Sequence, residues 1–191
     1  MRIIGGEFKG RRISAPDGMN TRPTTDRTRE AVFNLLTHAE WAPPLHDKRV
    51  IDAFAGSGSL GFEALSRGAS FCLFVETASP ARGAIRTNID TLGLFGRTRI
   101  HRRSATDLGT KPASVGPRFD IAFLDPPYGY ELAPKALAAL VGGDWLADDA
   151  IAVVETSKDE APTDYPDWTT LDSREYGPAR IAILARSPPT S

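Results

Sequence analysis

The stretch Asp52-Ala53-Phe54-Ala55-Gly56-Ser57-Gly58-Ser59-Leu60-Gly61 decides the fold of this chain. The apolar run before it predicts a strand over Val50–Phe54, and the residues after it predict a helix over 59–68. Its three glycines match the G-x-G-x-x-G pattern of a loop between a strand and a helix. Because glycine has no side chain, such a loop lets a ligand approach the backbone closely. The stretch therefore predicts a ligand site at the carboxyl end of a strand in an α/β sheet.

The rest of the chain continues this alternation of short apolar runs and helical stretches. Further strands are predicted at Cys72–Glu76, Thr98–His101, Ile121–Asp125, Ile151–Glu155, Thr169–Tyr176 and Arg180–Arg186. Further helices are predicted from a cap at Thr25 or Asp26 to about Ala39, at 79–92 and at 131–141. We expect a mostly parallel seven-stranded sheet, covered by helices on both faces, that ends in an antiparallel C-terminal hairpin. A small N-terminal β-hairpin, Arg2–Ile4 with Arg11–Ile13, is predicted to precede it.

Length and composition narrow the classes of function. The chain has 191 residues, of which 41% are hydrophobic and 25% charged, as in a single soluble globular domain. Its one cysteine, Cys72, excludes an internal disulfide. No apolar run is long enough for a membrane span or a signal peptide, so we expect a cytoplasmic protein. The histidines show no metal spacing, and no metal is predicted.

The charge of the chain is unevenly distributed. The formal net charge is −1, which disfavours a nucleic-acid binder of the uniformly basic kind. Residues 1–30, however, carry seven basic and four acidic groups, whereas residues 144–175 carry ten acidic and two basic groups. A basic front end on an acidic body favours a polyanion that contacts one face. The alternative is an unevenly charged surface that only water contacts.

Asp52 separates the ligands that the glycine loop could hold. A pyrophosphate prefers a bare helix N-terminus, and a carboxylate beside it would repel the phosphate charges. S-adenosylmethionine instead presents an ammonium and a sulfonium, which a carboxylate favours. Glu76, twenty residues beyond Gly56, is expected to accept hydrogen bonds from ribose hydroxyls. We predict cofactor contacts from Asp52, Phe54, Gly56, Gly58 and Glu76; the alternatives are a turn or cap role for Asp52 and a tight turn without a ligand.

A second element, Asp125-Pro126-Pro127-Tyr128, follows the predicted strand residues Ile121–Leu124. The Pro-Pro pair has no N–H groups and fixed φ angles, so its carbonyls can point at a ligand. The Asp125 carboxylate and the Pro126 carbonyl then offer two acceptors to an exocyclic amino group, and Tyr128 offers a flat face for stacking on a base. The base must leave its helix to enter such a pocket. The alternative is a rigid loop with an exposed tyrosine.

Together these elements resemble the class I methyltransferases that act on exocyclic amino groups, with their D-x-F-A-G-S-G loop and [DNS]-P-P-[YFW] motif. Within that class, the stretches Met1–Arg11, Arg22–Glu30, Phe54–Ala69 and Glu175–Gly177 resemble the RsmD family. The resemblance spans nearly the whole chain. It implies a Rossmann-like fold and methylation of the N2 amino group of one guanine in bacterial small-subunit (16S) ribosomal RNA, with S-adenosylmethionine as the cofactor.

The resemblance and the residues together give a set of expected roles. Residues 26–191 form the methyltransferase domain, and Asp125, Pro126 and Tyr128 form its catalytic set. Family members often carry an acid after the third strand that contacts adenine; Ser104 stands there, and Asp107 is the alternative contact. Residues 1–25 form a basic arm, with phosphate contacts expected from Arg2, Lys9, Arg11, Arg12 and Arg22. The expected partner is ribosomal RNA in a partly assembled small subunit, bound by a monomer.

Other functions compete with this interpretation. An adenine-N6 methyltransferase acting on DNA or RNA uses a similar tetrapeptide, and only the N-terminal resemblance argues against it. An oxidoreductase that uses a nucleotide cofactor would share the glycine loop, but Asp52 disfavours it. An RNA-binding assembly factor without catalytic activity would not need the intact 125–128 element.

Overall fold

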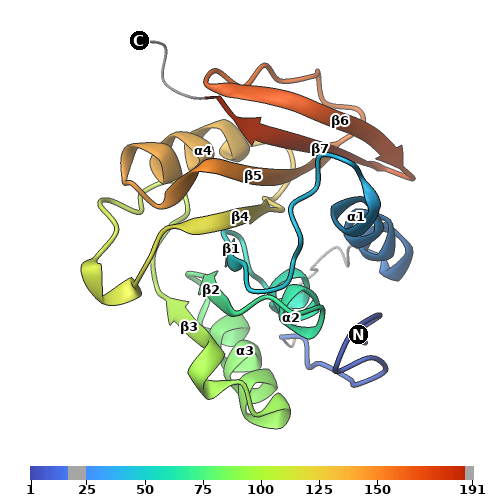
Figure 1. Ribbon diagram of the computed structural model, residues 1–191, viewed down its shortest axis with the longest axis vertical. Coiled ribbons are helices and arrows are strands. Elements are labelled where there is room, and N and C mark those ends of the chain that lie inside the picture. Colours follow the sequence, from blue (N-terminus) through green and yellow to red (C-terminus); the bar gives the residue numbers. More distant parts are fainter. Residues whose placement is uncertain (17–24, 188–191) are drawn as a thin grey trace.

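The computed structural model describes residues 1–16 and 25–187. Its centre is a seven-stranded sheet of order β3-β2-β1-β4-β5-β7-β6, in which β1 to β5 run parallel (Figure 1). β7 is antiparallel to both β5 and β6, so the predicted C-terminal hairpin is confirmed. The strands are β1 Arg49–Asp52, β2 Phe71–Val75, β3 Thr98–His101, β4 Phe119–Leu124, β5 Leu146–Ser157, β6 Trp168–Tyr176 and β7 Ala179–Arg186. The helices are α1 Asp26–His38, α2 Ser59–Ser66, α3 Ser79–Leu92 and α4 Leu132–Gly142, with short 3-10 turns at Phe95–Arg97 and Ala113–Val115.

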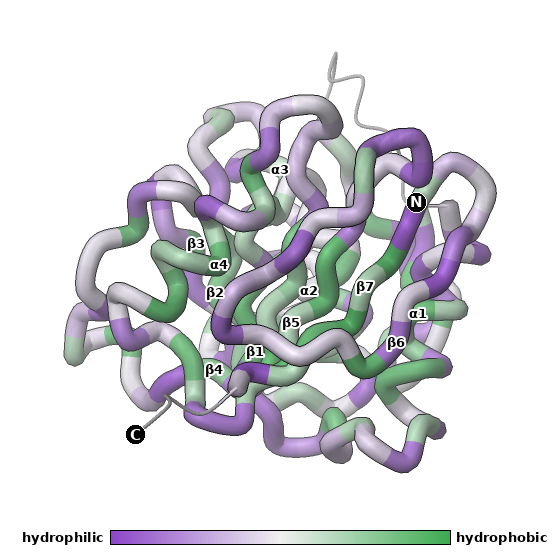
Figure 2. Tube along the Cα trace, turned by 90° about the horizontal axis from the view of Figure 1, so that it is seen from above, coloured by the Kyte–Doolittle hydropathy of each residue, from purple (hydrophilic) through white to green (hydrophobic). Residues whose placement is uncertain are grey.

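The sheet separates two apolar layers. On one face α1, α2 and α3 bury side chains such as Phe33, Phe62 and Ile85. On the other face α4 and the turn before β4 bury a second cluster around Trp145, whose side chain is fully buried. Figure 2 shows the same division as hydrophobic strands enclosed by hydrophilic loops. This burial of both faces accounts for the nearly continuous apolar strands of the sequence.

The first strands are shorter than predicted at the ends that carry the site. β1 ends at Asp52 and not at Phe54, and β2 ends at Val75, so that Glu76 lies beyond it. The chain leaves β1 by a turn, because Gly56 and Gly58 have φ angles of 53° and 81° that no strand accommodates. β5 is longer than predicted and begins at Leu146. Its first part extends the sheet beside β4 at the end remote from the glycine loop.

The N-terminal segment packs directly on the body of the protein. In place of the two predicted strands there is one antiparallel bridge, Arg2 with Arg12. Ile3 and Ile13 are 2% and 4% exposed and belong to the apolar cluster beneath α1 and α2. Backbone hydrogen bonds from Ile3 to Arg11 and from Ile13 to Met1, both 3.0 Å, flank the bridge, and Gly6 and Gly10 turn the chain between them with φ angles of 76° and 83°.

Buried polar groups hold this segment in place. Glu63 of α2 is fully buried and accepts the backbone N–H groups of Ile4 and Gly5 at 2.9 and 2.8 Å. The same carboxylate pairs with Arg67 at 2.8 Å. Asn88 of α3 makes a second link: its Oδ1 accepts the N–H of Ser14 at 2.7 Å, and its Nδ2 donates to the carbonyl of Ser14 at 3.0 Å.

Candidate active site

A cavity of about 840 Å³ lies at the carboxyl ends of the parallel strands, where the sequence places the ligand. It is lined by the loops that follow four neighbouring strands and by one residue of β5. These are residues 53–57 and 59 after β1, 76–78 after β2, 103–105 after β3, 125–128 after β4, and Glu155, together with Met1, Val75 and Leu132. The two motifs that the sequence identified separately therefore face one space.

Glu76 fixes the glycine loop to the next strand. Its Oε2 accepts the N–H of Gly56 at 2.8 Å, and its Oε1 accepts the N–H of Ala78 at 2.7 Å. Each carboxylate oxygen has a further lone pair, so both can still accept a ribose hydroxyl. A Cβ at Gly56 would meet no atom within 4 Å, so the backbone here is open to a ligand. Gly56 and Phe54 both line the cavity, and their contact with a cofactor stays a prediction.

The two later glycines serve packing. Gly58 is the N-cap of α2, and a Cβ there would lie 2.6 Å from the ring of Phe62. A Cβ at Gly61 would lie 2.4 Å from the ring of Phe74. Neither glycine lines the cavity, so Gly58 lies behind the loop surface that a ligand would touch. Its direct contact with a cofactor stays a prediction.

Asp52 lies beneath the loop and is 1% exposed. Its Oδ2 accepts the N–H of Gly61 at 3.1 Å, while its Oδ1 has no hydrogen-bond partner among the described residues. Burial, and then the charge of Glu76, raise the pKa of Asp52 from 3.8 to about 7. Asp52 does not line the cavity, and its expected place near the methionine end of a cofactor stays a prediction.

The Asp125-Pro126-Pro127-Tyr128 element follows β4 directly and lines the cavity with all four residues. The hydroxyl of Tyr128 donates a hydrogen bond of 3.0 Å to Oε1 of Glu155, which is 7% exposed. A second cavity, of about 380 Å³, adjoins the first and shares residues 126–128, Leu132 and Glu155 with it. The tyrosine is thus held at the boundary between the two spaces.

Glu155 is the functional candidate that the sequence interpretation missed. It lies in the last part of an apolar run, after Val154, in the same position as Glu76 after Val75 and Asp125 after Leu124. The structure keeps Glu155 within β5, which runs to Ser157, so the usable signal in the sequence is an acidic residue directly after a run of buried apolar residues.

The loop after β3 contains both candidates for an adenine contact. Ser104 lines the cavity, whereas Asp107 does not. The Ser104 hydroxyl lies 2.9 Å from that of Thr106 and accepts the Thr106 N–H at 3.3 Å. The geometry favours Ser104.

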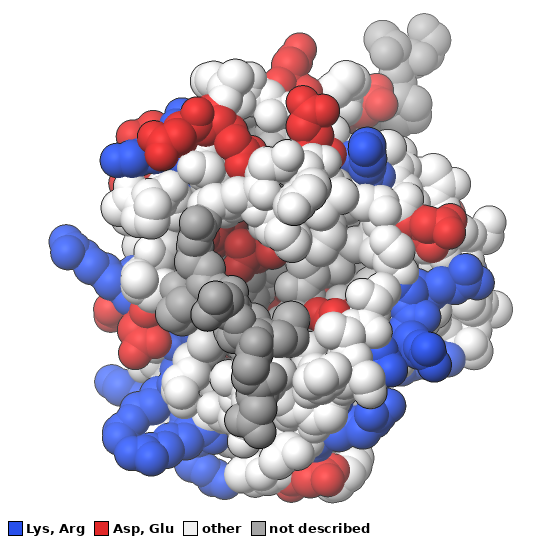
Figure 3. Space-filling view, turned by 180° about the vertical axis from the view of Figure 1, so that it is seen from behind, with Lys and Arg blue, Asp and Glu red and all other residues white. Residues whose placement is uncertain are grey.

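The basic residues of the N-terminal segment lie on the surface. Arg2, Lys9, Arg11 and Arg12 are exposed, and Arg22 lies outside the described residues. Figure 3 shows a hollow with acidic side chains inside it and Lys and Arg side chains gathered on both sides. Arg103, in the loop after β3, is a basic residue that lines the cavity itself.

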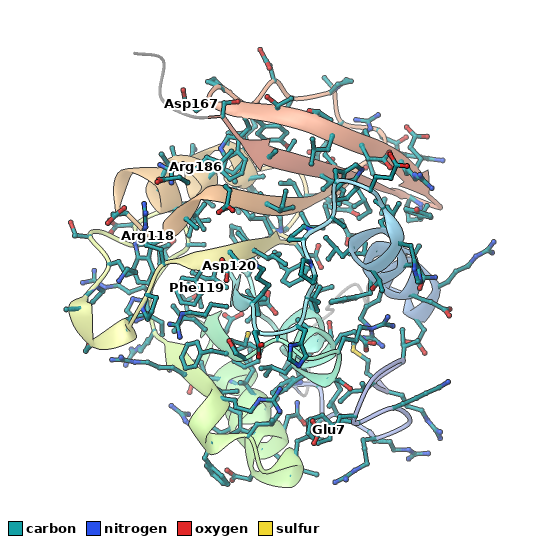
Figure 4. All side chains as sticks on the ribbon, viewed as in Figure 1. Glu7, Arg118, Phe119, Asp120, Asp167 and Arg186 are labelled. Atoms are coloured by element: carbon teal, nitrogen blue, oxygen red, sulfur yellow. The ribbon has the colours of Figure 1, made fainter. Side chains whose placement is uncertain are left out.

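Charged residues at the other end of the sheet have structural partners. Asp120 accepts the backbone N–H of Arg49 at 2.8 Å, Arg118 pairs with Asp148 at 3.0 Å, and Arg186 donates to the carbonyl of Leu146 at 2.8 Å (Figure 4). These contacts join strand ends remote from the cavity. In residues 1–16 and 25–187, no group of His, Cys, Asp and Glu side chains is arranged to hold a metal ion. No helix in these ranges is long and apolar enough to cross a membrane.

Comparison with known proteins decides the family. A family model described as "Conserved hypothetical protein 95" matches residues 1–185. The chain belongs to this family. Ribosomal RNA small subunit methyltransferase D from Escherichia coli strain K12 is 37% identical over 187 residues, which cover 97% of this chain and 90% of that protein. The protein of the same name from Haemophilus influenzae is 36% identical over 178 residues, 93% and 89% of the two chains.

A solved structure agrees with these sequence matches. The Escherichia coli protein yhhF superimposes with a TM-score of 0.81 at 34% identity, over 98% of each chain. The predicted membership of the RsmD family and the predicted class I methyltransferase fold are therefore confirmed.

Proposed function

We propose that this protein transfers a methyl group from S-adenosylmethionine to the exocyclic N2 amino group of a guanine in bacterial 16S ribosomal RNA. Relatives from Escherichia coli and Haemophilus influenzae are named ribosomal RNA small subunit methyltransferases, and this chain is a methyltransferase of their family. The observation that carries the proposal is that the 125–128 element and the glycine loop line one cavity. A base amino group and a methyl donor can meet there.

The cavity fits S-adenosylmethionine, the cofactor of this enzyme class. Its volume of about 840 Å³ is within the usual range for small-molecule sites. The open backbone at Gly56, the Glu76 carboxylate and the Ser104 hydroxyl would hold the cofactor, and the buried Asp52 carboxylate would lie beneath its cationic end. When bound, the cofactor supplies a methyl carbon already activated by a positively charged sulfur.

The residues after β4 would prepare the base. The Asp125 carboxylate and the Pro126 carbonyl accept the two N–H groups of the amino nitrogen, which frees its lone pair for attack. Tyr128 stacks on the base, and its hydrogen bond to Glu155 fixes the ring. A nitrogen–carbon bond forms while the carbon–sulfur bond breaks, so alignment of the two groups supplies most of the rate. Asp125 stabilises the positive charge that develops on the nitrogen and receives its proton, directly or through water.

The exposed cations of the N-terminal segment would contact RNA phosphates. Arg2, Lys9, Arg11 and Arg12 lie on the surface, and Arg22 completes the proposed set. Such contacts orient the RNA and raise affinity without reading its sequence. Because this set of cations is small, it suits an RNA that is already folded within a partly assembled small subunit. The ribosomal proteins there would add further contacts with the enzyme. We place the enzyme in the bacterial cytoplasm as a monomer.

The decisive experiment supplies radiolabelled S-adenosylmethionine with 16S RNA, either naked or in partly assembled small subunits, and digests the product to nucleosides. Label in N2-methylguanosine supports the proposal, and the Asp125→Ala variant serves as the blank. Label in N6-methyladenosine, or no label, contradicts it. Equal labelling of the two RNA forms would contradict the preference for a particle.

A further inference from the structure

Two acidic residues, Asp125 after β4 and Glu155 in β5, line the cavity at the proposed base site. Leu124 of β4 pairs in parallel register with Val154 of β5. Asp125 follows the end of β4, and Glu155 lies within β5 beside it, about 5 Å away in backbone position. Strand alternation fixes the direction of the Glu155 side chain, whereas Asp125 already lies beyond β4. Both line the main cavity.

Glu155 lies where its side chain could form a hydrogen bond with a base in the cavity. It is 7% exposed, yet it borders both cavities. Its Oε1 accepts a hydrogen bond from the hydroxyl of Tyr128, the residue whose ring would stack on the base. This bond sets the carboxylate relative to the plane of the ring. An acceptor next to a stacking ring can reach only the edge of a base that lies on that ring.

Resting on the function proposed above, we infer that Glu155 determines specificity for guanine by accepting a hydrogen bond from its N1–H. The Watson–Crick edge of guanine carries donors at N1 and N2, whereas adenine carries an amino group beside an N1 lone pair. Asp125, the Pro126 carbonyl and Glu155 present only acceptors to this edge. Guanine satisfies all three, while adenine would turn its N1 lone pair toward a buried carboxylate.

The energetic consequence favours strong discrimination. A site built to pair with a substrate donor rejects an analogue that lacks this donor far more strongly than an apolar pocket rejects a wrong shape. The tetrapeptide alone fits any exocyclic amino group, so Glu155 supplies the choice between the two purines.

The test uses target RNA in which 2-aminopurine replaces the modified guanine. This base keeps the N2 amino group but has a lone pair in place of N1–H. We expect the wild-type enzyme to prefer guanine over 2-aminopurine by about 100-fold or more in kcat/KM. In Glu155→Gln the amide can donate to N1, so the preference should fall below about 10-fold. The control Glu160→Gln, which borders only the second cavity, should keep the wild-type ratio.

The possible outcomes separate the two proposals. Equal wild-type rates on the two bases, or an unchanged ratio in Glu155→Gln, would overturn the role of Glu155. This comparison of wild-type rates needs no variant to fold. Wild-type enzyme that labels no N2-methylguanosine in unmodified RNA would instead refute the proposed function. Loss of structure in Glu155→Gln would also leave the ratio unchanged, so the ratio is compared only for variant protein whose circular dichroism spectrum and affinity for S-adenosylmethionine match those of the wild type.

Discussion

The backbone N–H of Gly56 donates a hydrogen bond of 2.8 Å to Oε2 of Glu76. One side chain therefore both shapes the glycine loop and faces the cavity in which the cofactor would lie. The residue expected to bind ribose has a second task that the sequence did not reveal. Its substitution should weaken cofactor binding for two reasons at once.

We expect Glu76→Ala to raise the dissociation constant of S-adenosylmethionine by about 10- to 100-fold, because charge-assisted hydrogen bonds contribute about 1.5–3 kcal/mol. Glu76→Gln should lose less, since its amide oxygen can still accept one N–H. Calorimetric titration measures both. Asp107→Ala, which lies outside the cavity, is the matched control. Unchanged affinity in Glu76→Ala would contradict the assignment.

Asp125→Ala should reduce methyl transfer by about 1,000-fold or more, because it removes both an amino-group acceptor and the stabilisation of developing charge. Cofactor affinity should stay within about threefold of wild type. Single-turnover kinetics and titration separate the two effects. A large loss of cofactor binding in this variant would show that Asp125 acts on the cofactor and not on the base.

The stability of the protein without cofactor should depend on the protonation of Asp52. Burial raises its pKa from 3.8 to about 7. Between these pH values the folded protein keeps a proton that the unfolded chain has released. The contribution of Asp52 to the free energy of unfolding is therefore largest at the acid end of this range. It falls as the pH rises toward 7 and is constant above pH 7, and this contribution decreases by at most about 4 kcal/mol.

Asp52→Asn removes this titration, and its amide oxygen can still accept the N–H of Gly61. Its free energy of unfolding relative to wild type should rise between pH 5 and pH 8, as measured by urea unfolding. Asp90→Asn, at an exposed position, is the control and should show no such trend. If the difference in the free energy of unfolding between Asp52→Asn and wild type is the same at pH 5 and pH 8, the predicted titration is excluded.

Glu63→Ala should destabilise the protein by about 3–5 kcal/mol, since it leaves Arg29 buried beside an empty position and deprives Ile4 and Gly5 of their acceptor. Glu7 offers a matched control, because its ion pair with Arg97 is exposed (Figure 4). Glu7→Ala should cost less than about 1 kcal/mol. Thermal and urea unfolding compare the two, and similar losses would show that Glu63 is not the main tether.

Replacing Arg11 and Arg12 with alanine should weaken RNA binding and reduce the slope of log K against log salt by about 1.5–2. Arg118 and Arg174 lie elsewhere on the surface, and both pair with acids. Their double alanine variant removes the same charge and should leave the slope unchanged. Equal slopes in the two double variants would mean that the N-terminal segment does not bind phosphate.

The sequence predicted the features that depend on local pattern. The seven strands with their C-terminal hairpin, the glycine loop, Glu76 and the 125–128 element follow from periodicity, turn residues and strand ends, and the structure brings the last three together. One glycine also has a packing role that the sequence did not predict. Gly58 matches the ligand-binding pattern, but its missing side chain makes room for Phe62.

The features that escaped prediction depend on contacts between distant parts of the chain. Glu63 meets Ile4 and Gly5 across more than fifty positions. Glu155 meets Tyr128 only because β4 and β5 are neighbours in the sheet. No local pattern specifies such pairs, and they become visible once the strand order is known.

Asn88 has a consequence for how this protein can be dissected. It bonds both ways with Ser14 and also donates to the carbonyl of Ser57 in the glycine loop, at 3.4 Å. Truncation before α1 would remove the backbone groups of Ser14, Ile4 and Gly5 that Asn88 and Glu63 bind, and would uncover the apolar surface beneath Ile3. A shortened protein would lose cofactor affinity together with RNA affinity, whichever residues touch the RNA. Only point substitutions of exposed arginines can separate substrate recruitment from the integrity of the catalytic body.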